Sequence, residues 1–379
     1  MAPRPAHAPV LNGSRFFWQA LWMAVGVRAG LFLVAYVTGV VYIGREHASL
    51  WQVLNETLNR WDAPHYLRIA EVGYLSHGED RLFLVFFPLF PALIRLVNHI
   101  VGNVLISGLV VSFAAAVAAG YCLQVLVRLD ADDEEATRSL WYLSLFPTAY
   151  FLAVPYSEAL FLALILASFL AARRQQWLFA GAFGLLACAT RLQGLALVPA
   201  LVVEAFGRTR GHVRSGARQA WPIVLAPLGF ALYLGINWLV AGDPLAWLTI
   251  QGEHWQHLPT LPWRAFLHSL GRVVGDPPGP YRTVVHEAMV ASASFAVILL
   301  VASARWLRPS YQVYAWTGVA LLTGATFQIS LPRYLLAVFP LFIVLARWGH
   351  RPAVHHAAVA ASAVLMGGLF IMYASRWGF

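Results

Sequence analysis

Apolar stretches of about 20 residues recur along the whole chain, and short segments between them hold most of the polar and charged residues. A helix of that length is what crosses the hydrocarbon core of a bilayer, so the pattern predicts an all-α polytopic membrane protein with about 11 spans. We expect the spans at 17–43, 104–127, 139–153, 156–172, 177–189, 193–206, 221–240, 288–306, 311–328, 332–348 and 354–373.

One further apolar segment, LFLVFFPLFPALIRLVNHI at 83–101, is long enough to cross but is interrupted. Pro88 and Pro91 fall in its first half and Arg95 in its second, and proline breaks the helical hydrogen-bond ladder. We therefore expect a broken segment that lies in the outer leaflet or dips into it.

The orientation follows from the arginine-rich loops, which the positive-inside rule places in the cytoplasm. These loops are 173–174, 207–218, 305–310 and 347–352. When the spans are counted back from these loops, the loop before 83–101 is extracytoplasmic only if 83–101 does not cross the membrane.

We interpret residues 1–379 as a single membrane-embedded domain with two long extracytoplasmic loops, 44–103 and 241–287. The second loop contains GEHWQHLPTLPWRAFLHSLGRVV, in which Trp, His and Leu are interleaved. Tryptophan is favoured at headgroup depth, so this stretch is typical of an amphipathic interfacial element. A lid over a site is the alternative.

Composition agrees with the membrane assignment: 60% of the residues are hydrophobic and 11% are charged, where a soluble domain has about 25%. The formal charge of +9 comes from arginine alone, because the chain has no lysine. Most of the arginines lie in short loops, which favours topology signals and lipid headgroup contacts over nucleic-acid binding. Cys122 and Cys188 lie within apolar segments, as small packing residues do.

The stretch NRWDAPHYLRIAEVGY, at 59–74, holds the first candidate for chemistry. Asp62 precedes Pro64, an arrangement typical of a helix N-cap, and capping alone is one interpretation. Trp61, His65 and Tyr66 surround this aspartate, and such a cluster of polar and aromatic groups beside a bilayer suits a sugar or phosphate ligand.

Four further charged residues lie next to apolar runs or within them. Arg191, in TRLQG, and Arg333, in SLPRY, lie at bilayer depth, where an arginine costs roughly 3 kcal/mol or more unless it is paired or faces water. Each arginine would extend its side chain to the lipid headgroups or form an ion pair that holds helices together. Alternatively, it would bind a phosphate through the planar guanidinium fork. Glu158, in PYSE, either complements the helix dipole or orients a substrate. Arg28, inside the first span, is a packing partner or a pathway residue.

Several familiar motifs are absent from the sequence: GxxxxGK[ST], HExxH, CxxC and GxSxG. Their absence argues against ATP hydrolysis, zinc proteolysis and serine hydrolysis. The acidic stretch DADDEE, at 130–135, would hold a divalent cation or form a solvated loop on the cytoplasmic side.

Taken together, RWDAPHYLRIAEVGY, FFPLFPALIRL, the long segment from FPTAYFLAVPYSE to TRLQGLALVPAL, and SLPRYLLAVFPLF resemble the PIG-V-like mannosyltransferases. These are bacterial relatives of the enzyme that adds the second mannose to the GPI anchor, within the GT-C superfamily. The resemblance spans most of the chain in the same order. One departure is Leu192, where the family pattern has proline; it affects the expected local backbone but leaves Arg191 in place.

The resemblance implies a GT-C-like helical bundle that transfers a sugar, most simply mannose, from a polyprenyl-phosphate donor. Asp62, in the first extracytoplasmic loop, would be the catalytic base. Arg191 and Arg333 would hold the donor phosphate. Substrate contacts are expected from Trp61, His65, Tyr66, Tyr156, Glu158 and Gln193.

No cofactor or metal is expected, because a lipid-phosphate donor does not require the metal site of a nucleotide-diphosphate donor. The implied partners are the donor, an unknown lipid, glycan or protein acceptor, and membrane lipids. The implied location is the inner (plasma) membrane, with the site facing the extracytoplasmic side. The alternatives are a transporter or scramblase of a lipid-linked phosphate, and a catalytically silent subunit of a larger complex.

Overall fold

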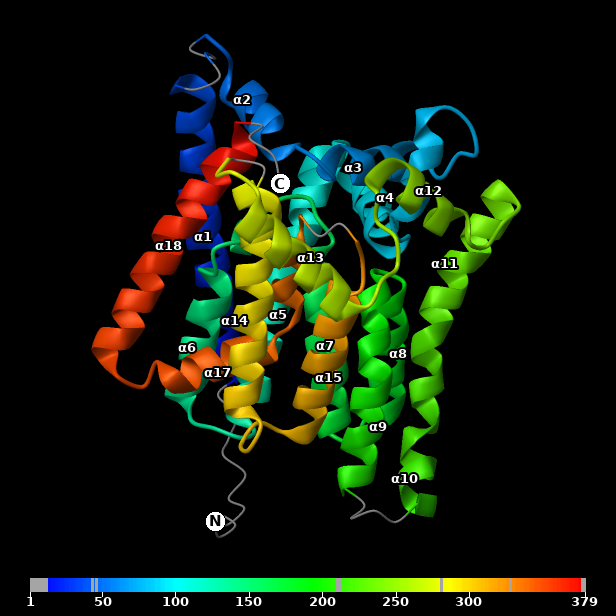
Figure 1. The fold of residues 1–379 in the computed structure, drawn as a ribbon, viewed down its shortest axis with the longest axis vertical. Helices are drawn as coiled ribbons and strands as arrows, with labels where there is room; N and C mark the ends of the chain where they lie inside the picture. Colours follow the sequence, from blue (N-terminus) through cyan, green and yellow to red (C-terminus); the bar gives the residue numbers. More distant parts are fainter. Residues whose placement is uncertain are drawn as a thin grey trace.

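The computed structural model describes residues 13–41, 44, 47–208, 213–279, 282–326 and 329–375. The residues that it describes form helices and turns without a strand, and their isolated β-bridge pairs Pro259 with Ala325. Figure 1 shows the result as a bundle of upright helices with shorter helices lying across its upper end. The prediction of an all-α fold is confirmed.

The α-helices are α1 (Gly13–Val41), α2 (Leu50–Leu58), α3 (Ala63–Val72), α4 (Leu89–Val101), α5 (Val104–Arg128), α6 (Asp133–Ser144), α7 (Glu158–Arg173), α8 (Trp177–Cys188), α9 (Leu197–Arg208), α10 (Val213–Ala220), α11 (Leu225–Ala241), α12 (Ala246–Trp255), α13 (Pro262–Gly275), α14 (Ala288–Ser303), α15 (Pro309–Thr323), α16 (Leu331–Tyr334), α17 (Pro340–Trp348) and α18 (Pro352–Ala374). Short 3₁₀ segments join them: η1 (Glu79–Val85), η2 (Ala149–Leu152), η3 (Leu192–Ala196), η4 (Trp221–Val224) and η6 (Leu335–Ala337). A π-helical turn, η5 (Arg282–Glu287), precedes α14.

Within the described residues, 5 helical stretches are long and apolar enough to cross a membrane, or up to 7 if each of two bent pairs counts as one span. The 5 are Gly13–Val41, Val104–Arg128, Trp221–Ala241, Val285–Ser303 and Pro352–Ala374. The protein is therefore multi-pass, while the expected count of about 11 spans stays a prediction.

The segment predicted to be broken is broken. The axes of η1 and α4 meet at 115°. Pro88 is the N-cap residue of α4 and Pro91 lies in its first turn, where the missing N–H has no helical partner to lose. Whether this segment crosses the bilayer stays a prediction.

Two other predicted spans are not single helices. The segment 139–153 is divided because α6 ends at Ser144 and a 3₁₀ turn begins at Ala149, on either side of Pro147. The segment 332–348 bends by 85° ahead of Pro340. In both, the proline lacks a donor and disfavours helical backbone at the residue before it. The sequence prediction followed hydrophobicity and overrode these breaks.

The helix α7 is the centre of the bundle. It is apolar all round, and 14 of its residues, from Glu158 to Ala172, are buried, as expected of a helix covered on every side. It packs against α5 and α8. The first residue of α7 is Glu158 and its last is Arg173, so this one helix links the two ends of the molecule.

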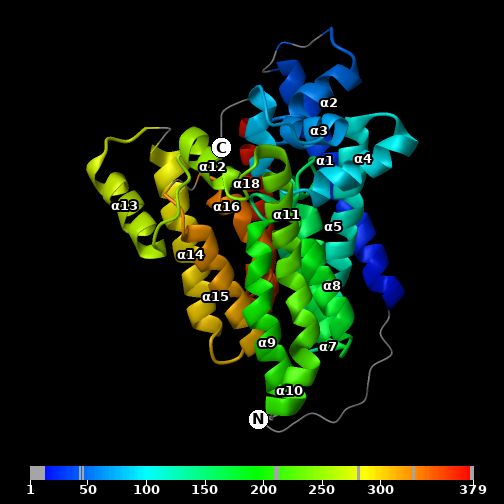
Figure 2. The ribbon, with the colours of Figure 1, turned by 90° about the vertical axis from the view of Figure 1, so that its right-hand side faces the viewer.

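The basic segments gather at one end of the bundle. In Figure 1 the C-terminal end of α9, α10 and the turn from α14 to α15 lie at the lower end, whereas α2, α3 and α12 lie at the upper end. The helix α12 packs against η1, and Figure 2 shows α13 standing apart on the outer side of the bundle. The loop 241–287 therefore contributes one helix close to η1 and one that projects outward.

Candidate active site

The start of α3 presents Asp62 toward the interior of the upper end. Trp61 precedes it with a φ of 57°, a left-handed conformation that is uncommon for a bulky residue. Asp62 occupies the N-cap position, as predicted, but its side chain makes no capping hydrogen bond. Its Oδ2 instead accepts a 2.8 Å hydrogen bond from Nη1 of Arg333. The expectation that this carboxylate caps the helix is therefore wrong, and the carboxylate faces the rest of the site.

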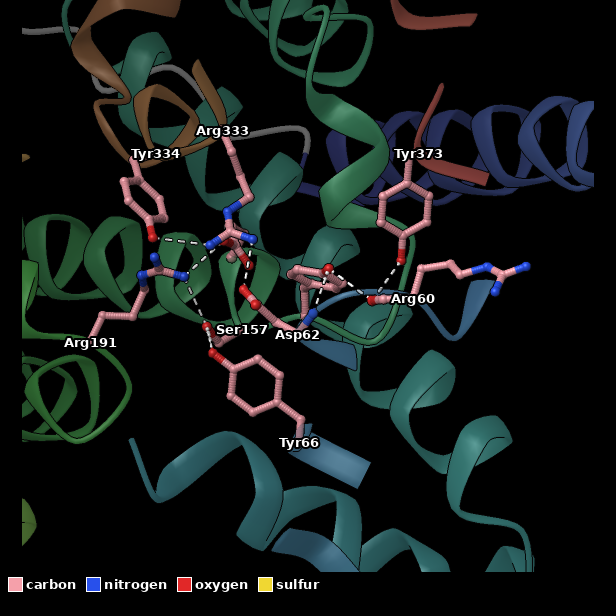
Figure 3. Close-up of polar contacts among 10 residues, drawn as sticks. Arg60, Asp62, Tyr66, Ser157, Arg191, Arg333, Tyr334 and Tyr373 are labelled. Atoms are coloured by element: carbon pink, nitrogen blue, oxygen red, sulfur yellow. Dashed lines mark hydrogen bonds and ion pairs between the residues drawn. The ribbon is translucent and has the colours of Figure 1, made fainter. Parts of the chain in front are cut away.

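Backbone contacts hold Asp62 in place. Its amide N–H donates to the hydroxyl of Tyr156 at 3.1 Å, and that hydroxyl donates to the carbonyl of Arg60 at 3.0 Å. Tyr156 is buried, and it lies two residues before Glu158, the first residue of α7. The position of Asp62 is thus coupled to the N-terminal end of α7 (Figure 3).

Glu158 joins the two arginines. Its Oε1 lies 2.8 Å from Nη1 of Arg191 and 3.0 Å from Nε of Arg333. We call Asp62, Arg333, Glu158 and Arg191 the site network. Two guanidinium groups converge on a single carboxylate oxygen, and the formal charges of the four side chains cancel.

Aromatic rings and hydroxyls frame the guanidinium groups. The ring of Tyr334 lies 4.7 Å from the guanidinium carbon of Arg191 and 4.8 Å from that of Arg333, within range of a cation–π contact. Arg333 also donates to the Tyr334 hydroxyl at 3.1 Å. Arg191 donates to Ser157 Oγ at 3.0 Å, and this oxygen shares a 2.9 Å hydrogen bond with Tyr66 (Figure 3).

A cavity of about 220 Å³ adjoins the site network. Five of the predicted site residues line it: Asp62, Tyr66, Arg191, Gln193 and Arg333. Its other lining residues are Val85, Phe86, Phe87, Thr190, Leu192, Trp247, Gln251, Trp255, His257, Ile329, Ser330 and Tyr334. The cavity lining therefore combines the two arginines of the site network with aromatic and polar side chains from α12 and the residues after it.

The remaining predicted residues lie behind the cavity wall. Glu158 is 4% exposed and contacts the cavity through the arginines that it pairs with. Trp61 and Tyr156 line a much smaller cavity on the other side of Arg333. His65 stacks on Phe83 and Phe86, with ring centroids 4.7 and 5.2 Å apart. Burial lowers the pKa of His65 and outweighs the opposing effect of Asp62, so the ring is neutral, and its contact with a substrate stays a prediction.

The structure adds residues that the sequence did not single out. Ser157, Ser330 and Tyr334 stand inside or beside the motifs PYSE and SLPRY, so those motifs carried the signal. The residues from α12 and its C-terminal end had no comparable signal, because polar and aromatic residues in a loop are common. In the loop 241–287, α12 lines the cavity while α13 exposes Trp263 and Leu267, and the interfacial and lid interpretations of this loop both stay predictions.

Arg28 and the acidic stretch 130–135 lie away from the cavity. Arg28 donates to the carbonyl of Leu152 at 2.6 Å and thereby ties α1 to η2, as a packing partner does. In the acidic stretch, Asp132 caps α6 by accepting from the amide of Glu135. Among the described residues, no group of three His, Cys, Asp or Glu side chains is placed to hold a metal ion.

Comparison with known proteins supports the resemblance. Residues 41–211 match the family described as Mannosyltransferase (PIG-V). This match includes Asp62, Glu158 and Arg191, and it ends before Arg333. A search of curated proteins finds no match.

Among solved structures, the chain is similar to an oligosaccharyltransferase from Archaeoglobus fulgidus, determined in complex with zinc and sulfate. The two share 14% sequence identity and superpose with a TM-score of 0.49, over 92% of this chain and 53% of the other. The chain thus spans about half the length of that protein.

The fold defines the class of the protein as a multi-pass helical membrane protein, and the family that matches part of it is one of glycosyltransferases. Residues 41–211 match the PIG-V mannosyltransferase family model, in agreement with the resemblance drawn from the motifs of the chain.

Proposed function

We propose that the protein moves a sugar from a polyprenyl-phosphate donor to an acceptor hydroxyl on the extracytoplasmic face of the membrane. The mannosyltransferase family that residues 41–211 match supports mannose as this sugar. The observation that carries this proposal is the convergence of Arg191 and Arg333 on one oxygen beside the Asp62 carboxylate. Two cations and a carboxylate on one cavity supply a binding site for a phosphate leaving group and an acceptor for a proton.

The donor phosphate would take the position between the two guanidinium groups. Arg191 Nη1 and Arg333 Nε are 2.8 and 3.0 Å from the same Glu158 oxygen, so both can reach one phosphate. Charge-assisted hydrogen bonds to a phosphate are stronger than those between neutral groups. The same contacts would stabilise the negative charge that grows on the phosphate as the glycosidic bond breaks.

Asp62 would act as the general base. Its side chain is 28% exposed, so an acceptor hydroxyl can approach it. The acceptor oxygen would bond to the anomeric carbon while the bond from that carbon to the phosphate oxygen breaks. The hydroxyl proton would pass to Asp62 and polyprenyl phosphate would leave. Attack from the face opposite the phosphate gives inversion at the anomeric carbon.

The location also belongs to the proposal. The basic segments lie at the end opposite the site (Figure 1), and the positive-inside rule would orient that end toward the cytoplasm. The site would then face the extracytoplasmic side of the inner membrane, where a lipid-anchored donor presents its sugar. No metal or cofactor is part of this reaction scheme.

A transfer assay tests the proposal. Purified protein in proteoliposomes would be incubated with radiolabelled polyprenyl-phosphate mannose and a membrane extract as the source of acceptors. We expect a labelled product and released polyprenyl phosphate. If the wild type gives no labelled product from mannose, glucose or pentose donors, the transferase proposal fails.

The scramblase alternative is separated by lipid movement in the same vesicles. A scramblase would carry a fluorescent polyprenyl phosphate across the bilayer and would keep doing so in Asp62→Asn. A transferase would lose turnover in that variant and would leave lipid movement at the level of empty vesicles.

A further inference from the structure

Part of the cavity lining is formed by α12 and the residues after it. Trp247, Gln251, Trp255 and His257 make up this part, and none of the four carries a permanent charge. We call these residues the α12 wall. A phosphate is favoured beside the arginines, whereas the α12 wall offers two indole rings and two neutral hydrogen-bonding groups.

His257 is held in a defined orientation and tautomer. Its Nδ1 lies 2.7 Å from Oε1 of Gln251, and its amide donates to the carbonyl of the same residue at 3.1 Å. With the Gln251 oxygen as acceptor, Nδ1 carries the hydrogen, and Nε2 keeps its lone pair. Within the described part of the chain Nε2 has no hydrogen-bond partner. Burial lowers the pKa of His257, which keeps the ring neutral.

The backbone around His257 is braced against the segment that leads to Arg333. Leu258 accepts from the amide of Thr326 at 2.9 Å, and Thr260 donates to the carbonyl of Gly324 at 2.9 Å. The Thr326 hydroxyl accepts from the amide of Leu258 at 3.0 Å and donates to the carbonyl of Gln256 at 2.6 Å. These contacts hold the α12 wall against the element that carries one of the phosphate-binding arginines.

We infer that the α12 wall is a subsite for a neutral sugar of the acceptor, with His257 Nε2 accepting a hydrogen bond from one of its hydroxyl groups. The indole rings of Trp247 and Trp255 give flat apolar surfaces for the C–H face of that ring. The inference rests on the proposed transfer only in calling this sugar the acceptor. It narrows the acceptor from any lipid, glycan or protein to one that presents a sugar.

Two substitutions of His257 separate its two nitrogens. Asparagine places an amide near Nδ1 and keeps the contact with Gln251 while removing an acceptor at Nε2. Glutamine extends an amide oxygen toward the position of Nε2. The matched control is His254→Asn, because His254 is on the same segment but is exposed and does not line the cavity.

The experiment uses octyl α-mannoside as the acceptor probe and polyprenyl-phosphate mannose as the donor. We expect His257→Asn to raise the KM for octyl mannoside about ten-fold, as loss of a hydrogen bond to a buried polar group does. The KM for the donor should not change, and His257→Gln and His254→Asn should stay close to the wild type. Equal KM values for octyl mannoside in the Asn and Gln variants, or a matching rise in donor KM, would overturn the inference.

Equilibrium binding keeps the two proposals distinguishable. Saturation-transfer NMR on the detergent-solubilised protein measures octyl mannoside binding without turnover, with octanol as the chain-only control. Selective loss of sugar binding in His257→Asn supports the subsite even if no transfer occurs, and absent transfer then counts against the proposed function alone. Sugar binding that is equal in all four proteins overturns the subsite.

Discussion

Among the described residues, two networks each contain two arginines and two carboxylates, and α7 links them. The site network includes Glu158, the first residue of α7. The second network, which we call the clamp network, consists of Arg173, the last residue of α7, with Asp130, Arg308 and Glu204. Glu158 and Arg173 suit the helix dipole, with the negative charge at the N-terminal end and the positive charge at the C-terminal end. The rise over the 16 residues of α7 separates the networks by about 24 Å.

The clamp network is made of paired, bidentate contacts. Arg173 binds both oxygens of Asp130, at 2.6 and 2.8 Å, and also donates to Tyr311. Arg308 binds both oxygens of Glu204, each at 2.8 Å, and Ser310 donates to the same carboxylate at 2.7 Å. Such geometry fixes α5, α7, α9 and the start of α15 to one another.

The site network uses the same residue types with fewer contacts. Asp62 binds Arg333 through one oxygen, Glu158 binds both arginines through one oxygen, and Glu158 Oε2 is buried without a partner among the described residues. Three of the four side chains also border the cavity. The number of ion pairs therefore does not identify a site, whereas unused hydrogen-bonding capacity beside a cavity does.

Arg333→Met should have the largest effect, because it removes the arginine that contacts both carboxylates of the site network. We expect transfer at saturating donor to fall about 10²–10³-fold, as when one donor to a developing anion is lost. Breaking a buried ion pair should also cost about 3–5 kcal/mol of stability. Initial rates and thermal unfolding in detergent measure the two effects. Wild-type rates in this variant would show that Arg333 does not bind the donor phosphate during transfer.

Arg173→Met should separate stability from turnover. It removes the hydrogen bonds to Asp130 and Tyr311 and should cost about 1.5–3 kcal/mol, the range for a hydrogen bond to a charged group, while Glu204 keeps Arg308 and Ser310. The transfer rate per folded molecule should match the wild type, since Arg173 lies at the far end of α7. Active-site titration beside the unfolding curve gives the rate per folded molecule. A rate loss equal to that of Arg333→Met would erase the distinction between the networks.

Glu158→Gln should strengthen donor binding by about ten-fold or less, since one carboxylate no longer competes with the phosphate for the two guanidinium groups. The donor KM measures this change. Glu204→Gln is the matched control in the clamp network, and it should leave donor KM unchanged. A higher donor KM in Glu158→Gln would show that the carboxylate supports the phosphate site instead of competing for it.

Tyr334→Phe should have the smallest effect. It removes one hydroxyl that accepts from Arg333 and keeps the ring that both guanidinium groups contact. Loss of one hydrogen bond of about 1 kcal/mol predicts a fall of roughly five-fold in kcat/KM. Tyr314→Phe, whose hydroxyl donates to the carbonyl of Ala337, is the control and should keep wild-type kinetics.

Much of the fold could be predicted from the sequence, because a helix that crosses a bilayer needs about 20 apolar residues in a row and such stretches are recognisable. The break around Pro88 was equally readable, since proline has a fixed chemistry. Pro147 carried the same signal inside the segment 139–153, where hydrophobicity hid it. The number of spans could not be settled from composition, because buried helices such as α7 are as apolar as membrane-facing ones.

The charged members of the site were predictable, whereas their pairing was not. Asp62, Arg191 and Arg333 stand out because a charge in apolar surroundings needs a reason. Their roles stay predictions. Asp62 and Arg333 are 271 residues apart, so only the fold reveals that the aspartate binds an arginine instead of capping its helix. His257 could not be predicted for a different reason: it follows α12, and only the fold shows that this helix and the residues after it line the cavity.

The most direct test compares Asp62→Asn with Asp130→Asn, one aspartate from each network, in the same purified preparation. We expect Asp62→Asn to lower transfer by about 10²–10⁴-fold, the contribution of a general base, while donor affinity stays near the wild type. Asp130→Asn should lower the unfolding temperature and keep transfer per folded molecule. Wild-type transfer by Asp62→Asn, or an equal loss in both variants, would contradict the claim that Asp62 carries the chemistry.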